Sequence, residues 1–325
     1  MKFLSEYFNS GNAKQQNQKR LAALAVCVTA ALLAVALVAL LIGSVATAIK
    51  NKAPDTSGEG DDTGTKIPVG YTTTNLSEAG YSIHNGTLLV IDESHPFAST
   101  ATLVQPQPNV RAKDEGVDLY RGAYDTINVT QETLDAFNAM VSAFHAEKKG
   151  EEGYGTGNLW LQSRLSSKEY SASADAALKS ATGLIVCHQE KGTENDEVSI
   201  YDSATKKAVG VYQWIYDNAY KYGFIQVSTA EGEENVFRYV GVAHAAYMKN
   251  NNKTFSEYVT LLQTTSASKP LSVSVKDADG KTVKYTMYYL SASAEAVVPA
   301  NNTYTVSGDN VGGYIVTVNP TTTTK

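Results

Sequence analysis

One group of residues able to do acid–base chemistry in this chain is a run of three glutamates. Glu231, Glu233 and Glu234 lie within four positions, around Gly232. A carboxylate acts as a general base only where a nucleophile, such as a metal-bound water, is held against it. The group is therefore either part of a hydrolytic site or a solvated acidic loop. The residues that could place a nucleophile decide between the two.

A zinc-bound water would need about three protein ligands and one open coordination position. His84, His95 and His145 are scattered along the chain and show no ligand spacing. The two cysteines, Cys27 and Cys187, cannot pair within one folded chain, because Cys27 lies inside a long apolar run. Spacing alone therefore predicts neither a metal cluster nor a disulfide framework.

Other chemistries lack their motifs. The chain has no Gly-x-Ser-x-Gly elbow, no Ser-x-x-Lys followed by a Lys-Thr-Gly box, and no phosphate-binding loop. Its formal net charge of −6 also argues against nucleic acid as a partner, because there is no basic face to displace counterions from phosphates.

A more specific signal lies in residues 222–258, which read YGFIQVSTAEGEENVFRYVGVAHAAYMKNNNKTFSEY. This stretch resembles the VanY-type D-alanyl-D-alanine carboxypeptidases, in which a Tyr-Gly-Phe strand precedes Glu-Pro-Trp-His-Phe-Arg-Tyr-Val-Gly, then His-Ala and a Leu-Glu-Glu-Tyr helix. The segments that match in order and spacing are residues 222–225, 237–241, 244–245 and 256–258. The likeness extends more weakly over residues 67–318, with an appended β segment as in Gram-positive members. It implies a zinc peptidase fold that trims terminal D-Ala from peptidoglycan stem peptides.

The resemblance also implies where the site residues would lie, and most of them are changed. The zinc ligands of the family fall on Ser180, Cys187 and Val236, and its general base falls on Glu233, which is retained. Asn235 stands where the family has tryptophan. Serine and valine do not hold zinc, and one cysteine thiolate is not enough for a catalytic site. We therefore expect no metal cofactor, an idle Glu233 and a catalytically inactive domain.

Substitute ligands find little support. His188 is one residue from the Asp position of the family, but a slip of one residue in a strand turns the side chain to the opposite face. His244 matches a residue that the family also carries outside its zinc set. An active peptidase with unusual ligands stays an alternative, and it requires Cys187, His188 and Glu233 to converge within ~2–4 Å of a common point.

Two residues are candidates for binding substrate. Arg164 corresponds to the arginine that orients substrate in the family, and its guanidinium fork would suit a peptide carboxylate. A surface arginine after a strand is the plainer interpretation. Ser180 is the second candidate, at a former ligand position. Cys187 is expected to be a buried, small apolar residue rather than a reactive thiol.

Periodicity and turn residues predict a mixture of helices and strands. Helices are expected at residues 130–148 with Thr130 as N-cap, 171–179, 209–222 ending at Gly223, and 256–263. Strands are expected at residues 86–91, 159–161, 182–187, 271–275, 284–290, 303–306 and 313–318. Phe237 and Tyr239 alternate on a further strand and should pack in the core. The fold class is α+β, with a central antiparallel sheet flanked by helices (a VanY/hedgehog-like peptidase fold) and a C-terminal β extension.

An N-terminal apolar run determines the expected location. Residues 21–49 carry no charge and exceed the roughly 20 residues that cross a membrane as a helix. A secretory signal usually has a shorter apolar region, although small residues at 44, 46 and 48 leave cleavage open. Basic residues precede the run and acidic ones follow its end, which favours a cytoplasmic N-terminus and an extracytoplasmic domain at the cell membrane.

Composition shifts predict the following organisation. The parts are a cytoplasmic tail (1–20), a transmembrane helix (21–49), a disordered linker (50–66), a carboxypeptidase-like domain (67–265), a β-strand extension (266–319) and a disordered tail (320–325).

Three functions are compatible with these observations. The first is a membrane-anchored, inactive carboxypeptidase-like protein that binds peptidoglycan stem peptide or a cell-wall protein. The second is an active metallo-carboxypeptidase with unusual ligands. The third is a structural or adhesive surface module that binds through its β extension.

Overall fold

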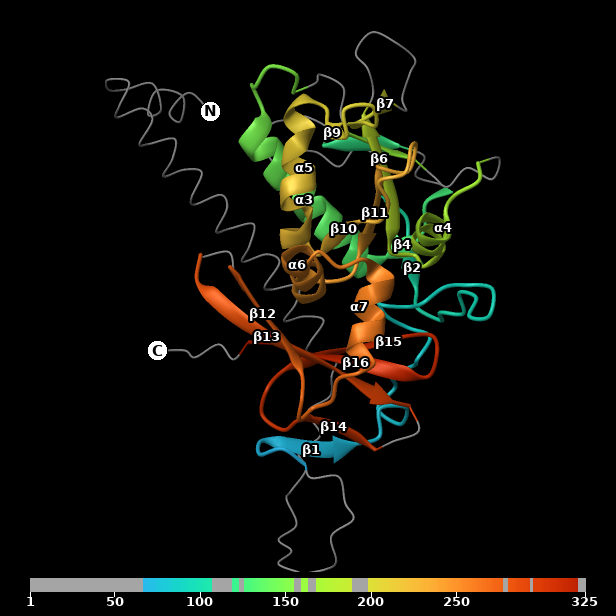
Figure 1. The fold of residues 1–325 in the computed structure, drawn as a ribbon, viewed down its shortest axis with the longest axis vertical. Coiled ribbons are helices and arrows are strands. Elements are labelled where there is room, and N and C mark those ends of the chain that lie inside the picture. Colours follow the sequence, from blue (N-terminus) through green and yellow to red (C-terminus); the bar gives the residue numbers. More distant parts are fainter. Residues whose placement is uncertain are drawn as a thin grey trace, which may run out of the picture. The chain divides into compact units, whose positions relative to one another are not determined.

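The computed structural model describes residues 67–106, 119–122, 126–154, 159–162, 168–188, 198–276, 280–292 and 295–320. The described residues from 67 to 275 and from 283 to 320 form one compact unit of helices and short strands (Figure 1). The expected transmembrane helix and linker lie outside the described residues. Among the helices that are described, none is long and apolar enough to cross a membrane.

A six-stranded sheet is the first layer of this unit, with strand order β10-β11-β6-β5-β3 and β7 also paired to β6. Neighbouring strands are antiparallel except β3 and β5, which run parallel, so the predicted antiparallel sheet is confirmed apart from this edge pair. The strands are β3 (Tyr120–Gly122), β5 (Leu159–Gln162), β6 (Gly183–His188), β7 (Val198–Ser199), β10 (Phe224–Gln226) and β11 (Val236–Tyr239).

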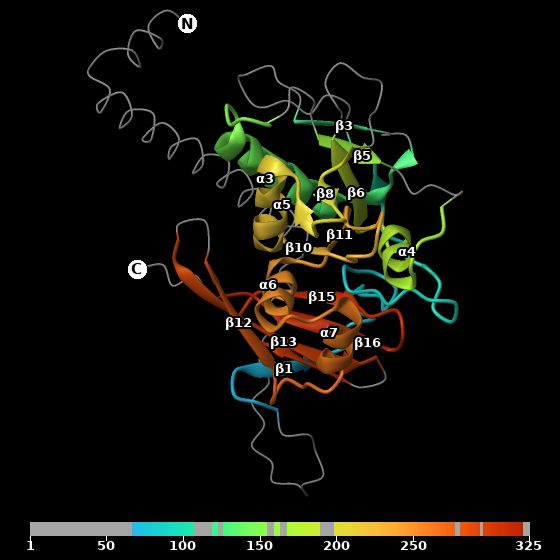
Figure 2. The same cartoon turned by 45° about the horizontal axis from the view of Figure 1, so that its top comes forward.

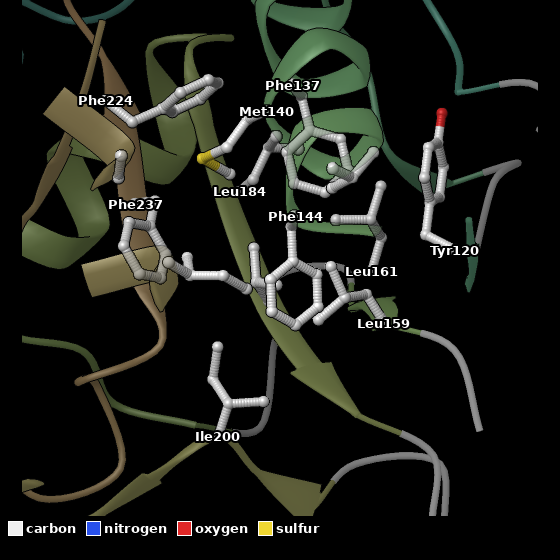
Figure 3. Packing of buried hydrophobic residues seen from close by; sticks show 14 of the residues in the cluster. Tyr120, Phe137, Met140, Phe144, Leu159, Leu161, Leu184, Ile200, Phe224 and Phe237 are labelled. Carbon is white, nitrogen blue, oxygen red and sulfur yellow. The ribbon is translucent and has the colours of Figure 1, made fainter. Parts of the chain in front are cut away.

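Helix α3 (Gln131–Lys148) covers one face of this sheet. It begins at the predicted N-cap, where the side chain of Thr130 accepts a hydrogen bond from the backbone of Thr133. Its apolar residues recur at helical spacing, so Phe137, Met140 and Phe144 all point to the sheet (Figure 3). The strands supply alternate residues to the same core, among them Leu184, Val186, Leu159, Leu161, Phe224 and Phe237.

Helix α4 (Ala172–Lys179) lies against the opposite face. Its Ala174 and Ala177 form a second apolar cluster with Ile185 and Cys187 of β6 and Val236 of β11. The helix approaches the sheet closely because Gly183 has no side chain: a Cβ there would overlap the carbonyl group of Ala177. This cluster is called the α4 cluster below.

The C-terminal part is a four-stranded antiparallel sheet with order β12-β13-β16-β15 (Figure 2). Met287 and Ile315 face helices α6 and α7, while Tyr288 and Val316 face the pair formed by β1 and β14. The elements are β1 (Tyr71–Thr74), α6 (Val242–Asn251), α7 (Phe255–Leu262), β12 (Leu271–Lys276), β13 (Thr282–Ser291), β14 (Ala296–Pro299), β15 (Tyr304–Gly308) and β16 (Gly313–Val318). The predicted strands of the β extension are confirmed, and they share a core with the two preceding helices. The boundary at residue 266 stays a prediction.

The predicted helix at residues 209–222 is wrong as a single element. It consists of a 3-10 turn (Gly210–Tyr212), α5 (Gln213–Asn218) and a second 3-10 turn (Ala219–Tyr222). The break falls at Asn218, whose side-chain amide donates to the carbonyl of Trp214 at 2.8 Å and so competes with the helix backbone. Gly223 ends the segment in the left-handed conformation, with φ 85°, as predicted for a C-cap.

The predicted strand at residues 86–91 is also wrong. Leu88 and Leu89 are buried there, but the segment joins no sheet. The backbone of Leu88 donates to the Ser307 side chain at 3.0 Å, and that of Val90 donates to the carbonyl of Asp309 at 2.9 Å. These two bonds, one to a side chain and one to the main chain, take the place of the backbone hydrogen bonds that a strand makes with its neighbour. Two minor pairs, β2 (Leu103–Val104) with β4 (Val129–Thr130) and β8 (Tyr201–Asp202) with β9 (Lys207–Ala208), complete the described strands.

Candidate functional site

Two of the three residues at the former ligand positions lie together at the α4 face of the six-stranded sheet. Cys187 in β6 and Val236 in β11 belong to the α4 cluster, and β6 and β11 are adjacent strands. Ser180 is the C-cap of α4 and connects that helix to β6. The structure therefore brings Cys187 and Val236 together beneath α4, and it places Ser180 at the C-terminal end of that helix, outside the cluster.

Ser180 is occupied within the fold. Its side chain is buried, with 1% of its surface exposed. Its hydroxyl lies 2.7 Å from the carbonyl oxygen of Ala177, to which it donates, and 2.6 Å from the hydroxyl oxygen of Thr182. These bonds close the C-terminal turn of α4. The assignment of Ser180 to substrate binding stays a prediction.

Cys187 lies in a network of neutral polar groups. Its thiol lies 3.8 Å from the carbonyl oxygen of Gln162, to which it donates, and it accepts from the side-chain amide of Asn235 at 3.4 Å. The carbonyl oxygen of Asn235 accepts from the hydroxyls of Ser199 at 3.1 Å and of Tyr216 at 3.3 Å. Burial raises the pKa of Tyr216, so its hydroxyl stays protonated and available as a donor. Cys187 itself is 3% exposed, in agreement with the expected small buried residue.

A zinc ion does not fit these positions. Val236 has no donor atom and is 1% exposed inside the α4 cluster, and the hydroxyl of Ser180 is bonded to its own helix. Cys187 would be a single ligand, below the three that a catalytic site uses. In the part of the chain that the structure describes, no group of three or more His, Cys, Asp or Glu side chains could hold a metal ion.

The proposed substitute ligands do not converge. The ring of His188 lies 5.2 Å from that of Tyr212, which belongs to the core on the α3 side of the sheet. Cys187 belongs to the cluster on the α4 side. The two side chains thus leave β6 on opposite faces, as the alternation of a strand requires. The arrangement that an active site of Cys187, His188 and Glu233 requires is absent from the described residues.

Glu233 is bonded to the N-terminus of α4. Its carboxylate accepts from the backbone N–H of Ser171 and, at 2.6 Å, from the hydroxyl of the same residue. Burial raises the pKa of Glu233, but hydrogen bonds from Ser171 and Ser228 and the charge of Lys168 outweigh it, so the net pKa is lowered. A general base works best with a pKa near the working pH. An ionised Glu233 with this lowered pKa is suited to holding the helix rather than to taking a proton.

The neighbouring acids differ in burial. Glu231 is exposed, whereas Glu234 is 2% exposed, and its Oε1 has no hydrogen-bond partner among the described residues. The acidic run is therefore not a uniformly solvated loop. Arg164, the first candidate for substrate binding, lies outside the described residues.

Two further motif residues have structural partners that the sequence did not indicate. Arg238 is fully buried, donates to the carbonyl of Leu89 at 2.7 Å and lies over the ring of Phe255 at 3.8 Å. Burial lowers its pKa to about 9. His244 is buried between the hydroxyls of Tyr258 and Thr317, at 2.7 and 2.8 Å from its two ring nitrogens. Arg238 thus connects β11 to Leu89 and α7, and His244 connects α6 to α7 and β16. Phe237 and Tyr239, on the α3 side, pack in the core as predicted.

A shallow hollow lies elsewhere, beside the C-terminal end of α3. Lys148, Glu151 and Trp214 are among its lining residues. These belong to α3, the turn after it and α5, on the other side of the sheet from α4. The hollow is therefore unrelated to the former ligand positions.

Comparisons with known proteins support the resemblance. A protein from Enterococcus faecium described as D-alanyl-D-alanine carboxypeptidase is 28% identical over 252 residues, which are 74% of this chain and 78% of that protein. The resemblance to the VanY-type carboxypeptidases is thereby confirmed. No family model matches the chain.

Among solved structures, the vancomycin-resistance D,D-dipeptidase VanXYg, in complex with a D-Ala-D-Ala phosphinate analogue, has a TM-score of 0.50 and 17% identity. The match covers 76% of this chain and 98% of that one. This likeness concerns the fold. The LdcB LD-carboxypeptidase aligns less well, with a TM-score of 0.33 and 20% identity over 50% of this chain and 79% of that one.

Proposed function

We propose that this relative of the D-alanyl-D-alanine carboxypeptidases binds peptidoglycan stem peptide, or a cell-wall protein, without cutting it. The observation that carries the proposal is the state of the ligand positions. Val236 is part of an apolar cluster, the Ser180 hydroxyl is bonded within its helix, and Cys187 stands alone as a metal donor. These three positions therefore lack the ligands that would hold a zinc ion and so activate a water.

The retained carboxylate supports the same proposal. Glu233 is engaged by two donors of Ser171, and its lowered pKa does not suit proton abstraction. Without a metal-bound water of lowered pKa, such a carboxylate has no nucleophile to deprotonate. We assign Glu233 to the architecture of the site and not to a chemical step.

The proposed ligand follows from the relatives. The E. faecium protein is described as a D-alanyl-D-alanine carboxypeptidase, and VanXYg was solved with a D-Ala-D-Ala analogue. A peptide ending in D-Ala carries a carboxylate that Arg164 would bind with its fork of N–H groups. The uncharged run at residues 21–49 would hold the domain outside the membrane, within reach of nascent peptidoglycan.

Calorimetric titration of the full chain with a stem pentapeptide ending in D-Ala-D-Ala tests the binding. We expect saturable binding, no release of D-Ala, and much weaker binding of the same peptide ending in L-Ala-L-Ala. Arg164→Met should weaken the binding, while Arg121→Met, at an exposed strand position, serves as the matched control. Equal affinity for both peptides would contradict recognition of D-Ala, and release of D-Ala would favour an active peptidase.

The third possible function, an adhesive module that binds through the β extension, cannot be tested cleanly by deleting that extension. Met287 and Ile315 of that extension lie in one core with Tyr258 and Leu262 of α7, so deletion would expose that core. Substitutions at exposed positions of β12 leave the core in place. We expect Ser272→Glu and Ser274→Glu to leave peptide binding unchanged, whereas a ligand site on the β extension predicts its loss.

A further inference from the structure

A short segment before α4 is fastened to the loop that carries Glu233. Residues 168–171, called the strap below, meet residues 228–235, the loop between β10 and β11. The side-chain amine of Lys168 donates to the carbonyl of Gly232, and Ser171 donates twice to the carboxylate of Glu233. The acceptors of all three hydrogen bonds are the neighbouring residues Gly232 and Glu233, so these contacts attach the strap to one point of the loop.

The strap covers the α4 cluster. Tyr170 is half-buried and packs against the cluster that contains Cys187 and Val236. The amine of Lys168 lies 5.0 Å from the centre of the Tyr170 ring, which ties the aromatic cover to the same fastening. The strap therefore forms part of the cover over the cluster that contains Cys187 and Val236.

Charge makes this fastening stronger than the rest of the strap. The carboxylate of Glu233 is buried, with 5% of its surface exposed, and its hydrogen bonds are charge-assisted. Lys168 is half-buried and adds a favourable charge beside it. Loss of the Glu233 contacts should therefore release the strap before the sheet or its cores open.

We propose that Glu233 and Lys168 latch the strap over the α4 cluster, and that the strap must open to admit a peptide at this face of the sheet. The gating part rests on the proposed peptide binding, whereas the latch does not. Closed chains do not bind, so the apparent affinity is the intrinsic affinity reduced to the open fraction. Weakening the latch should therefore increase both the exposure of the cluster and the affinity for the peptide.

Cys187 provides a direct reporter of opening because it is 3% exposed beneath this cover. The full chain is treated with dithiodipyridine under native conditions, and modification of the peptide that contains Cys187 is followed by mass spectrometry. Glu233→Ala removes both acceptors of Ser171, and Lys168→Met removes the amine with little change in size. Glu231→Gln and Glu169→Gln, at exposed neighbouring positions, are the matched controls.

We expect Glu233→Ala to raise the labelling rate of Cys187 about tenfold, which corresponds to roughly 1.4 kcal/mol of opening free energy. Lys168→Met should raise it by a smaller factor, and amide exchange in β16 should stay unchanged, which separates local opening from unfolding. Rates for both variants within the scatter of their controls would overturn the latch. A raised rate with unchanged affinity for a D-Ala-D-Ala peptide would overturn the gating, and a raised rate with no peptide binding by any variant would leave the latch and contradict the proposed function.

Discussion

His244 joins α6, α7 and β16, and it does so without any charged neighbour. Its ring is 5% exposed and lies between the hydroxyls of Tyr258 and Thr317. Tyr258 in turn lies near the sulfur of Met287, at 3.8 Å. Both hydroxyls could accept from a protonated ring, so the penalty of protonation comes from burying the charge rather than from lost hydrogen bonds. Burial lowers the pKa of His244 from 6.5 to about 3.

The sign of the pH effect follows from this lowered pKa. Between pH 6.5 and about 3, the unfolded chain takes a proton at this position and the folded chain does not. Stability is therefore greatest above the unfolded pKa, and the free energy of unfolding falls by about 1.4 kcal/mol for each pH unit below it. Acidification from pH 6.5 to about 5 should remove roughly 2 kcal/mol, a large share of a typical stability of about 5–15 kcal/mol.

Urea unfolding at about pH 7 and about pH 5, followed by tryptophan fluorescence, measures this loss. His244→Gln should lower stability at neutral pH by about 1–3 kcal/mol, because a neutral amide replaces only part of the hydrogen bonding. It should also lose much less stability on acidification than the unsubstituted chain. His95→Gln, at a half-buried position whose ring bonds the side chain of Asp92 at 2.9 Å, is the histidine control and should keep the loss that the burial of His244 causes. Equal acid losses in His244→Gln and the unsubstituted chain would refute the assignment of the pH dependence to this ring.

Three further outcomes are expected from the packing and from Glu233. Gly183→Ala should destabilise the chain by about 1–3 kcal/mol in urea unfolding, because its Cβ would overlap the carbonyl of Ala177 and push α4 from the sheet; an unchanged midpoint would contradict the close approach. Phe137→Ala, at the centre of the α3 core, should cost about 3–5 kcal/mol, and a loss below about 1 kcal/mol would show that this core is not packed as described. Glu233 has a lowered pKa, so the stabilisation it provides is present above pH 4.5 and is lost as the pH falls through the pKa of the folded state. Glu233→Gln should remove this loss of unfolding free energy at acid pH. An unchanged loss in the variant would show that another group causes it.

Elements with a clear period could be predicted from the sequence, and those held by tertiary contacts could not. Thr130 and the spacing of apolar residues predict α3 correctly, and alternation predicts β12. Helix α6 escaped prediction because four consecutive residues, 243–246, are all buried, so its buried residues do not follow a helical period. Residues 86–91 resemble a strand in composition, but their partners are a serine side chain and the end of a hairpin.

In the candidate site, too, features set by local geometry could be predicted, whereas features set by tertiary contacts could not. Strand alternation correctly separates His188 from Cys187, because it depends only on local geometry. The partners of Glu233 could not be foreseen, since Ser171 is 62 residues away in the chain. The buried neutral His244 is likewise produced by contacts over long sequence distances, with Thr317 lying 73 residues away. The residue type at a former ligand position shows that a metal ligand is missing. Only the fold shows which contacts the new side chain makes instead.

We propose that this chain keeps the fold of a zinc peptidase without a zinc site. Metal analysis of the full chain, after incubation with zinc and removal of the unbound ion, tests it most directly when combined with an assay for D-Ala release from a stem pentapeptide. We predict zinc well below one equivalent and no release of D-Ala, since Ser180 and Val236 offer no ligands and Cys187 stands alone. One equivalent of bound zinc together with released D-Ala would contradict this account.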